Sequence, residues 1–210
     1  MTIHEPSTLL TDLLLALLAG WLAWRLRQGR PDDRGAARWW GRALALTAAS
    51  AFVGGAYHGF APNFPEDLAH LWWIATLLII NLLSAVMAMG LLQEVRPARG
   101  SGRWAGLIAA KLAGFAVLAV LVPQFVVVIV DYGLTMAAWA VAAIWLRRAW
   151  SSWMLAAIGL SVAAAVIQQL RLAPSARFNH NDLYHVIQAF ALGCFYAAGK
   201  RLSPARPEAS

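Results

Sequence analysis

Residues 68–92 read LAHLWWIATLLIINLLSAVMAMGLL, a long apolar run without a single Asp, Glu, Lys or Arg. An α-helix needs about 20 such residues to cross the hydrocarbon core of a bilayer at 1.5 Å per residue. An uninterrupted run of this length is typical of a membrane helix and not of a soluble domain. The segment therefore predicts a membrane-spanning helix, and it sets the fold class for the rest of the chain.

The composition of the chain leads to the same class. Of its 210 residues 60% are hydrophobic and 13% are charged, and the mean hydropathy is +0.60. Soluble domains are roughly 45–50% apolar and about 25% charged. The net charge of +7 would suit a nucleic-acid partner, but the arginines lie in short loops between apolar runs, so we expect no nucleic acid. Cys194 is the single cysteine, which excludes a disulfide framework and a thiolate metal site.

Six further apolar segments qualify as membrane spans by the same reasoning. We therefore predict an all-α fold, an integral membrane bundle of seven transmembrane helices that occupies residues 1–202, with a disordered cytoplasmic tail at 203–210. The predicted spans are Leu9–Leu26, Ala43–Phe60, Leu68–Leu92, Trp104–Val122, Phe125–Leu146, Trp153–Leu170 and Leu183–Ala198.

Basic residues gather in alternate loops, and this asymmetry predicts the orientation. By the positive-inside rule the N-terminus lies outside and the C-terminus is cytoplasmic. The Ala- and Arg-rich composition fits a bacterial inner membrane. The basic loops carry Arg25, Arg27, Arg30, Arg34, Arg38 and Arg42 after the first span, Arg96, Arg99 and Arg103 after the third, Arg147 and Arg148 after the fifth, and Lys200, Arg201 and Arg206 after the seventh.

Residues 178–188 read FNHNDLYHVIQ and open the last span with an unusual density of polar side chains. Asn179 or Asn181 can cap the helix, because a short side-chain oxygen accepts from the free N–H groups of the first turn. Asp182 precedes His185 by three residues, so the two share a face. A carboxylate at that spacing can accept the imidazole proton or join it as a metal ligand.

The predicted topology brings scattered histidines to the same leaflet. His58 ends the second span on the outer side, Asp67 and His70 begin the third there, and His180 and His185 begin the seventh. Three imidazoles and a water form a catalytic zinc site. We therefore expect zinc on His58, His185 and either His70 or His180, with Asp182 or Asp67 as general base or ligand partner. Asp12 enters the first span from the same side.

The alternative interpretation of these residues is structural. Polar side chains are tolerated at the headgroup level, where Trp and Tyr form an aromatic belt. The candidates for such a belt are Tyr57, Trp72, Trp73 and Tyr184.

Polar residues deeper in the spans have simpler interpretations. We expect Lys111 to extend its ammonium group to the inner phosphates, although a tight hairpin would let it reach Asp131. Asp131 makes a structural hydrogen bond or lines a cavity. Asn81 and Ser84 are expected to form hydrogen bonds between helices, and the small residues 54–56 to let another helix approach closely.

Two short patches carry a resemblance to a known family. In the second span His58 fits a Ser-x-x-x-His pattern, with Gly54 at the serine position. In the seventh span His185 fits His-x-x-x-His, with Asn181 at the partner position, and Asp67 lies in the neighbourhood of the third-span aspartate. This pattern resembles the CREST superfamily, which includes alkaline ceramidases and the progestin/adiponectin receptor family. The run at 178–188 also resembles uncharacterised bacterial seven-span proteins.

The resemblance to the CREST superfamily implies a seven-helix membrane hydrolase or hydrolase-like receptor that holds zinc. We therefore predict a zinc-dependent hydrolase of a lipid amide or ester, with its site at the outer leaflet and a membrane lipid as substrate. Two alternatives remain. His58 and His185 could clamp a haem iron in a redox protein. A non-enzymatic sensor or scaffold could instead use the titration of its histidines to bias helix packing.

Overall fold

The computed structural model describes residues 1–28, 35–95, 101–175 and 178–202. These residues contain seven α-helices, one short 3-10 turn at Ala61–Asn63 and no strand, which confirms the predicted all-α class. The tail at 203–210 and several loop arginines lie outside the described residues. The helices are α1 (Pro6–Gln28), α2 (Ala36–Phe60), α3 (Glu66–Val95), α4 (Ser101–Leu121), α5 (Phe125–Leu146), α6 (Ser151–Gln169) and α7 (His180–Gly199).

Five helices in the described part of the chain are long and apolar enough to cross a membrane: α1, α3, α4, α5 and α6. This is consistent with an integral membrane protein. The other two, α2 and α7, begin with polar or basic segments that lower their hydropathy.

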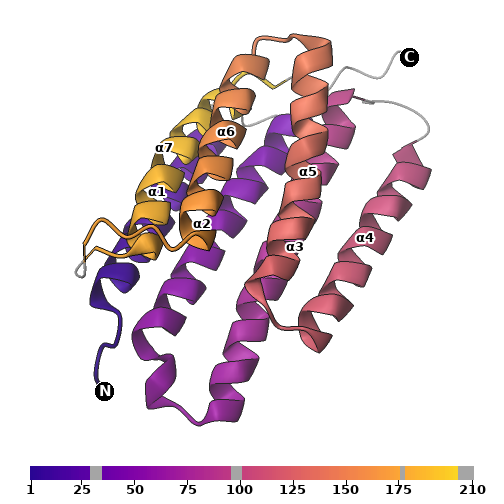
Figure 1. Ribbon diagram of the computed structural model, residues 1–210. Coiled ribbons are helices and arrows are strands. Elements are labelled where there is room, and N and C mark those ends of the chain that lie inside the picture. The colour runs from indigo at the N-terminus through magenta and orange to yellow at the C-terminus, as the bar shows by residue number, and fades with distance from the viewer. Residues whose placement is uncertain (29–34, 96–100, 176–177, 203–210) are drawn as a thin grey trace.

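The helices form a bundle in which they run up and down roughly alongside one another (Figure 1). Helix α1 packs against both α2 and α7, and α7 packs against α6, so the first and last helices of the chain are neighbours. Helix α4 lies at the edge of the bundle, mainly against α3 (Figure 1). The residues predicted to form the site belong to the ends of α1, α2, α3 and α7 that lie together at the lower end of Figure 1.

Buried tryptophans fill the core near the opposite end. Trp40, Trp139 and Trp150 lie edge-to-face in series, with ring centroids 5.0 Å and 5.4 Å apart. Each indole N–H has an acceptor, as a buried Trp requires: Trp40 Nε1 donates to the Phe195 carbonyl at 2.9 Å and Trp139 Nε1 to the Met87 carbonyl at 3.0 Å. These contacts join α2, α3, α5 and α7.

Trp150 Nε1 donates to the buried carboxylate of Glu94 at the end of α3, at 2.9 Å, and Arg148 pairs with the same carboxylate. A buried carboxylate is stable only when it is paired and hydrogen-bonded. This contact therefore ties the end of α3 to the turn between α5 and α6.

A second buried ion pair corrects the prediction for Lys111, which does not extend to the membrane surface. Its ammonium group pairs with Asp131 on α5 and donates to Ser84 Oγ at 2.9 Å and to Thr135 Oγ1 at 3.2 Å. Asn81 Nδ2 donates to the other Asp131 oxygen at 2.9 Å. Asn81 and Ser84 therefore bond between helices, as predicted. A charge in hydrocarbon needs such partners, so this cluster fastens α4 to α3 and α5.

Candidate functional site

The first turn of α7 is capped by the side chains of Asn179 and Asp182. Asn179 Oδ1 accepts from the backbone N–H groups of Asn181 at 2.8 Å and Asp182 at 3.2 Å. In return, Asp182 Oδ2 accepts from the backbone N–H of Asn179 at 2.8 Å. This reciprocal pair is a capping box, and it identifies Asn179 as the cap of the two candidates.

Helix α1 satisfies the remaining acceptor of Asp182. Thr8 Oγ1 donates to Asp182 Oδ1 at 3.1 Å and accepts from Asn179 Nδ2 at 3.2 Å. Asp182 has no exposed surface. Both of its oxygens thus have donors, and the carboxylate holds the start of α7 against α1.

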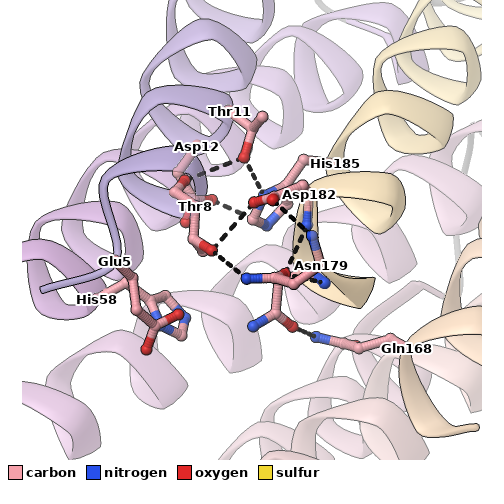
Figure 2. A network of polar contacts seen from close by, with 10 residues as sticks. Glu5, Thr8, Thr11, Asp12, His58, Gln168, Asn179, Asp182 and His185 are labelled. Atoms are coloured by element: carbon pink, nitrogen blue, oxygen red, sulfur yellow. Dashed lines mark hydrogen bonds and ion pairs between the residues drawn. The ribbon is translucent and has the colours of Figure 1, made fainter. Parts of the chain in front are cut away.

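His185 lies between two groups of α1 (Figure 2). Its Nε2 is 3.1 Å from Asp12 Oδ1, and its Nδ1 is 3.0 Å from Thr11 Oγ1. Asp12 is 5% exposed and His185 is 8% exposed, whereas Thr11 is only partly buried. The carboxylate that contacts His185 is therefore Asp12 from another helix, while the nearby Asp182 serves the cap.

The Thr11 hydroxyl has two possible acceptors, because its Oγ1 is also 3.0 Å from the Thr8 carbonyl oxygen. When His185 is neutral with its proton on Nε2, it donates to Asp12, and Thr11 can donate to Nδ1. When both ring nitrogens carry protons, Nδ1 donates to Thr11, and the Thr11 proton turns to the Thr8 carbonyl. The same heavy-atom positions therefore serve both protonation states of the imidazole.

His58 and Glu5 form a separate, more exposed pair beside this network (Figure 2). His58 Nδ1 lies 3.5 Å from Glu5 Oε2, and the two side chains are 27% and 45% exposed. The pair lies at the edge of the site, and it joins the N-terminal segment, which carries Glu5, to α2, which carries His58. His58 and His185 are thus at the same end of the bundle, with different partners.

The other predicted site residues lie outside the network drawn in Figure 2. Asp67 and His70 are exposed in the first two turns of α3, and His180 is half-buried at the first position of α7. Gln168 on α6 reaches the site through its amide, which donates to Asn181 Oδ1 at 3.3 Å.

The described side chains, as they are arranged, do not fit a three-imidazole zinc site. Among the residues that the structure describes, no three His, Cys, Asp or Glu side chains are grouped closely enough to hold a metal ion. Both nitrogens of His185 already have protein partners, and Nδ1 of His58 faces Glu5. Because both of its ring nitrogens have protein partners, His185 as arranged here also does not fit the role of an axial haem ligand. Zinc binding therefore stays a prediction.

Two threonines of the network, Thr8 and Thr11, were not singled out from the sequence. Together with Asp12 they recur at spacings of three and four residues, which places all three on one face of α1. Polar residues that share a face of an otherwise apolar span are the signal that could have identified them.

The close approach of α1 and α2 depends on glycine at position 55. A Cβ atom there would lie 2.5 Å from the Cβ of Asp12, far inside van der Waals contact. At Gly59, one turn further, a Cβ would meet Leu9 Cδ2 at 2.8 Å. The expectation that small residues at 54–56 let a helix approach closely is therefore confirmed, and the helix concerned is the one that carries Asp12.

We expect Gly55→Ala to destabilise the protein by about 1–3 kcal/mol, the usual cost of overpacking, and to displace Asp12 from His185. Gly54→Ala is the matched control, because a Cβ at Gly54 meets only Thr76 Cγ2 at an ordinary 3.5 Å. Chemical unfolding in detergent micelles measures both variants. Equal stability of the two variants would show that α1 and α2 are not in this close contact.

The family described as "Family of unknown function (DUF6962)" matches residues 7–204. This range includes Thr8, Thr11, Asp12 and His185. No curated protein and no solved structure matches the chain. The chain therefore belongs to DUF6962.

Proposed function

We propose that this member of DUF6962 is a membrane-embedded hydrolase of a lipid ester or amide in which Thr11, His185 and Asp12 carry out the reaction. One observation supports this: a buried imidazole lies between a carboxylate at 3.1 Å and a hydroxyl at 3.0 Å. A hydroxyl, a base and a group that orients the base recur on unrelated folds, and they are recognised by geometry and not by sequence position.

Each group has one task in this proposal. Asp12 accepts the Nε2 proton of His185, which orients the ring and leaves the Nδ1 lone pair facing Thr11. Nδ1 takes the Thr11 proton as Oγ1 attacks the carbonyl carbon, and Asp12 stabilises the resulting imidazolium. That proton passes to the leaving alcohol or amine, which leaves an acyl ester on Thr11. Water, deprotonated by the same imidazole, then attacks the acyl ester and releases the carboxylic acid, and the imidazolium returns its proton to Thr11 Oγ1.

The depth of the site suits a lipid substrate. All seven helices cross the membrane in our proposal, with the N-terminus outside and the C-terminus in the cytoplasm of a bacterium. Thr11 follows the first residue of α1 by five positions, which places it roughly 8 Å along the helix. The ester and amide groups of lipids lie just beneath the headgroups, at a comparable depth. A relation to the CREST hydrolases fits this arrangement, with His58 and His185 on the second and seventh helices.

The Thr11 hydroxyl provides the sharpest test. Purified protein in nanodiscs is given a fluorogenic phospholipid ester and a fluorescent ceramide amide. We expect Thr11→Val to lower hydrolysis about 10³-fold or more, because it removes the nucleophile and keeps the shape of the side chain. Thr11→Ser keeps the hydroxyl and is expected to retain most activity.

Thr47→Val is the matched control, since Thr47 is a threonine of α2 whose hydroxyl donates only along its own helix, to the Ala43 carbonyl at 3.0 Å. It should hydrolyse at the wild-type rate. Wild-type activity in Thr11→Val, or no hydrolysis of any lipid ester or amide by the wild type, would refute the proposal.

A second candidate function is a pH-responsive change in helix packing. It is favoured by the fact that both contacts of His185 cross from α7 to α1. A change in the charge of the imidazole would alter the strength of that connection. In that case the wild type hydrolyses nothing, and the difference in unfolding temperature between the wild type and His185→Gln varies with pH but is unaffected by chelators.

A further inference from the structure

Basic side chains gather at the end of the bundle opposite the Thr11–His185 site. They belong to the end of α1, the start of α2 and the end of α7, and we call this group the basic corner. Its members are Arg25, Arg27, Arg38, Arg42, Lys200 and Arg201.

Close packing brings these three helix ends together. A Cβ atom on Gly199 of α7 would lie 2.5 Å from Trp40 Cδ1 of α2 and 3.2 Å from Leu26 Cδ2 of α1. A Cβ on Gly41 would meet the side chain of Arg27 at 3.7 Å. The three helix ends that carry the basic side chains are therefore packed together, although they come from distant parts of the sequence.

The exposed arginines of the basic corner have no carboxylate partner among the residues that the structure describes. The only carboxylate that the described residues place at this end is Glu94, which is buried and paired with Arg148. Arg25, Arg27, Arg38 and Arg201 are exposed, and Arg42 is half-buried. Like charges gathered at one end of the bundle repel one another, so an anionic ligand would relieve an electrostatic cost.

Aromatic rings lie beneath several of these charges. Arg42 lies over the Trp39 ring at 4.7 Å, Lys200 over Tyr196 at 4.8 Å and Arg25 over Trp21 at 5.9 Å. A guanidinium that stacks on a ring keeps the N–H groups of its edge available for an anion. Trp and Tyr favour the headgroup level of a bilayer, where one end of the ring is apolar and the other is hydrated.

We infer that the basic corner binds the phosphate groups of an anionic phospholipid in the leaflet that it faces. The guanidinium edges match a phosphate in geometry, and the rings beneath them fit the boundary between headgroup and acyl chain. A phospholipid is the occupant that combines both features, since free phosphate has no part that would contact the aromatic rings. This inference does not depend on the proposed hydrolysis, because it concerns the other end of the bundle.

Native mass spectrometry of the full chain tests the inference, with phosphatidylglycerol and phosphatidylcholine of equal chain length as probes. We expect the wild type to retain phosphatidylglycerol preferentially. Arg27→Gln/Arg42→Gln should bind it about 25-fold more weakly, because each basic group near an anionic surface contributes about a factor of five. Inorganic phosphate at the same concentration should not displace the lipid.

The matched control is Arg103→Gln/Arg147→Gln, which removes the same charge from α4 and the end of α5 at the same end of the bundle. It should leave binding within about two-fold of the wild type. Equal losses in both double variants would mean that total charge and not the basic corner attracts the lipid. No loss in either, or displacement by inorganic phosphate, would overturn the inference as well.

Discussion

Asp12→Asn is expected to hydrolyse a fluorogenic lipid ester about 10⁴-fold more slowly than the wild type, because an amide cannot hold the imidazole in the tautomer that leaves Nδ1 unprotonated. The carboxylate is 3.1 Å from Nε2, and its Oδ1 is the only acceptor that the described residues offer to that nitrogen. Steady-state kinetics in nanodiscs should show the loss in kcat.

Glu5→Gln is the control for a lost carboxylate, since Glu5 is 45% exposed and contacts His58 instead. It should retain activity within about ten-fold of the wild type. The double variant Asp12→Asn/His185→Gln should be no slower than His185→Gln alone, because residues that act as one unit are not additive. Independent, additive losses would mean that Asp12 and His185 do not act together.

Lys111→Met is expected to destabilise the protein by about 3–5 kcal/mol, because it leaves the carboxylate of Asp131 buried without its countercharge. Asp131 is fully buried, and its other side-chain donor among the described residues, Asn81, is neutral. Denaturant unfolding in mixed micelles measures the loss.

Adding Asp131→Leu should recover most of this stability, since replacing a whole buried ion pair with apolar side chains is often neutral. Arg103→Met, a loss of positive charge at an exposed position of the same helix, should change stability by less than about 0.5 kcal/mol. A Lys111→Met variant as stable as the wild type, or a double variant less stable than either single variant, would show that the pair does not fasten α4.

The helices were predictable because long apolar runs can be recognised directly in the sequence. The predicted span Phe125–Leu146 has the bounds of α5, since Gln124 and Arg147 interrupt the run on either side. Helix α2 begins at Ala36, seven residues before the predicted start at Ala43. The extra turns contain arginines, which a hydropathy window excludes although they continue a helix readily.

The contact between Lys111 and Asp131 was predicted only as an alternative, because depth was counted at the backbone. Lys111 lies ten residues before the end of α4, and Asp131 lies six residues after the start of α5. The difference of four residues amounts to roughly 6 Å, which a lysine side chain can span. Position along the helix therefore does not decide where a long side chain places its charge.

The site was predictable in part. Local spacing predicted a cap at Asn179 or Asn181, and it placed Asp182 and His185 on one face of the helix. The choice of Asp12 over Asp182 as the partner of His185 does not follow from local spacing, because it depends on how α1 lies against α7 and on Thr8, which occupies the remaining oxygen of Asp182. Tertiary packing between the first and the last helix decides which carboxylate contacts His185.

The covalent state of Thr11 during turnover tests the proposed centre most directly. Wild-type protein is incubated with a lipid ester, quenched in acid, digested and analysed by tandem mass spectrometry. We expect one acyl group per chain on the Thr11 peptide, an adduct that Thr11→Val lacks and that His185→Gln forms at least about 10²-fold more slowly. Hydrolysis without an adduct on Thr11, an adduct on another residue, or no hydrolysis at all would contradict the proposal.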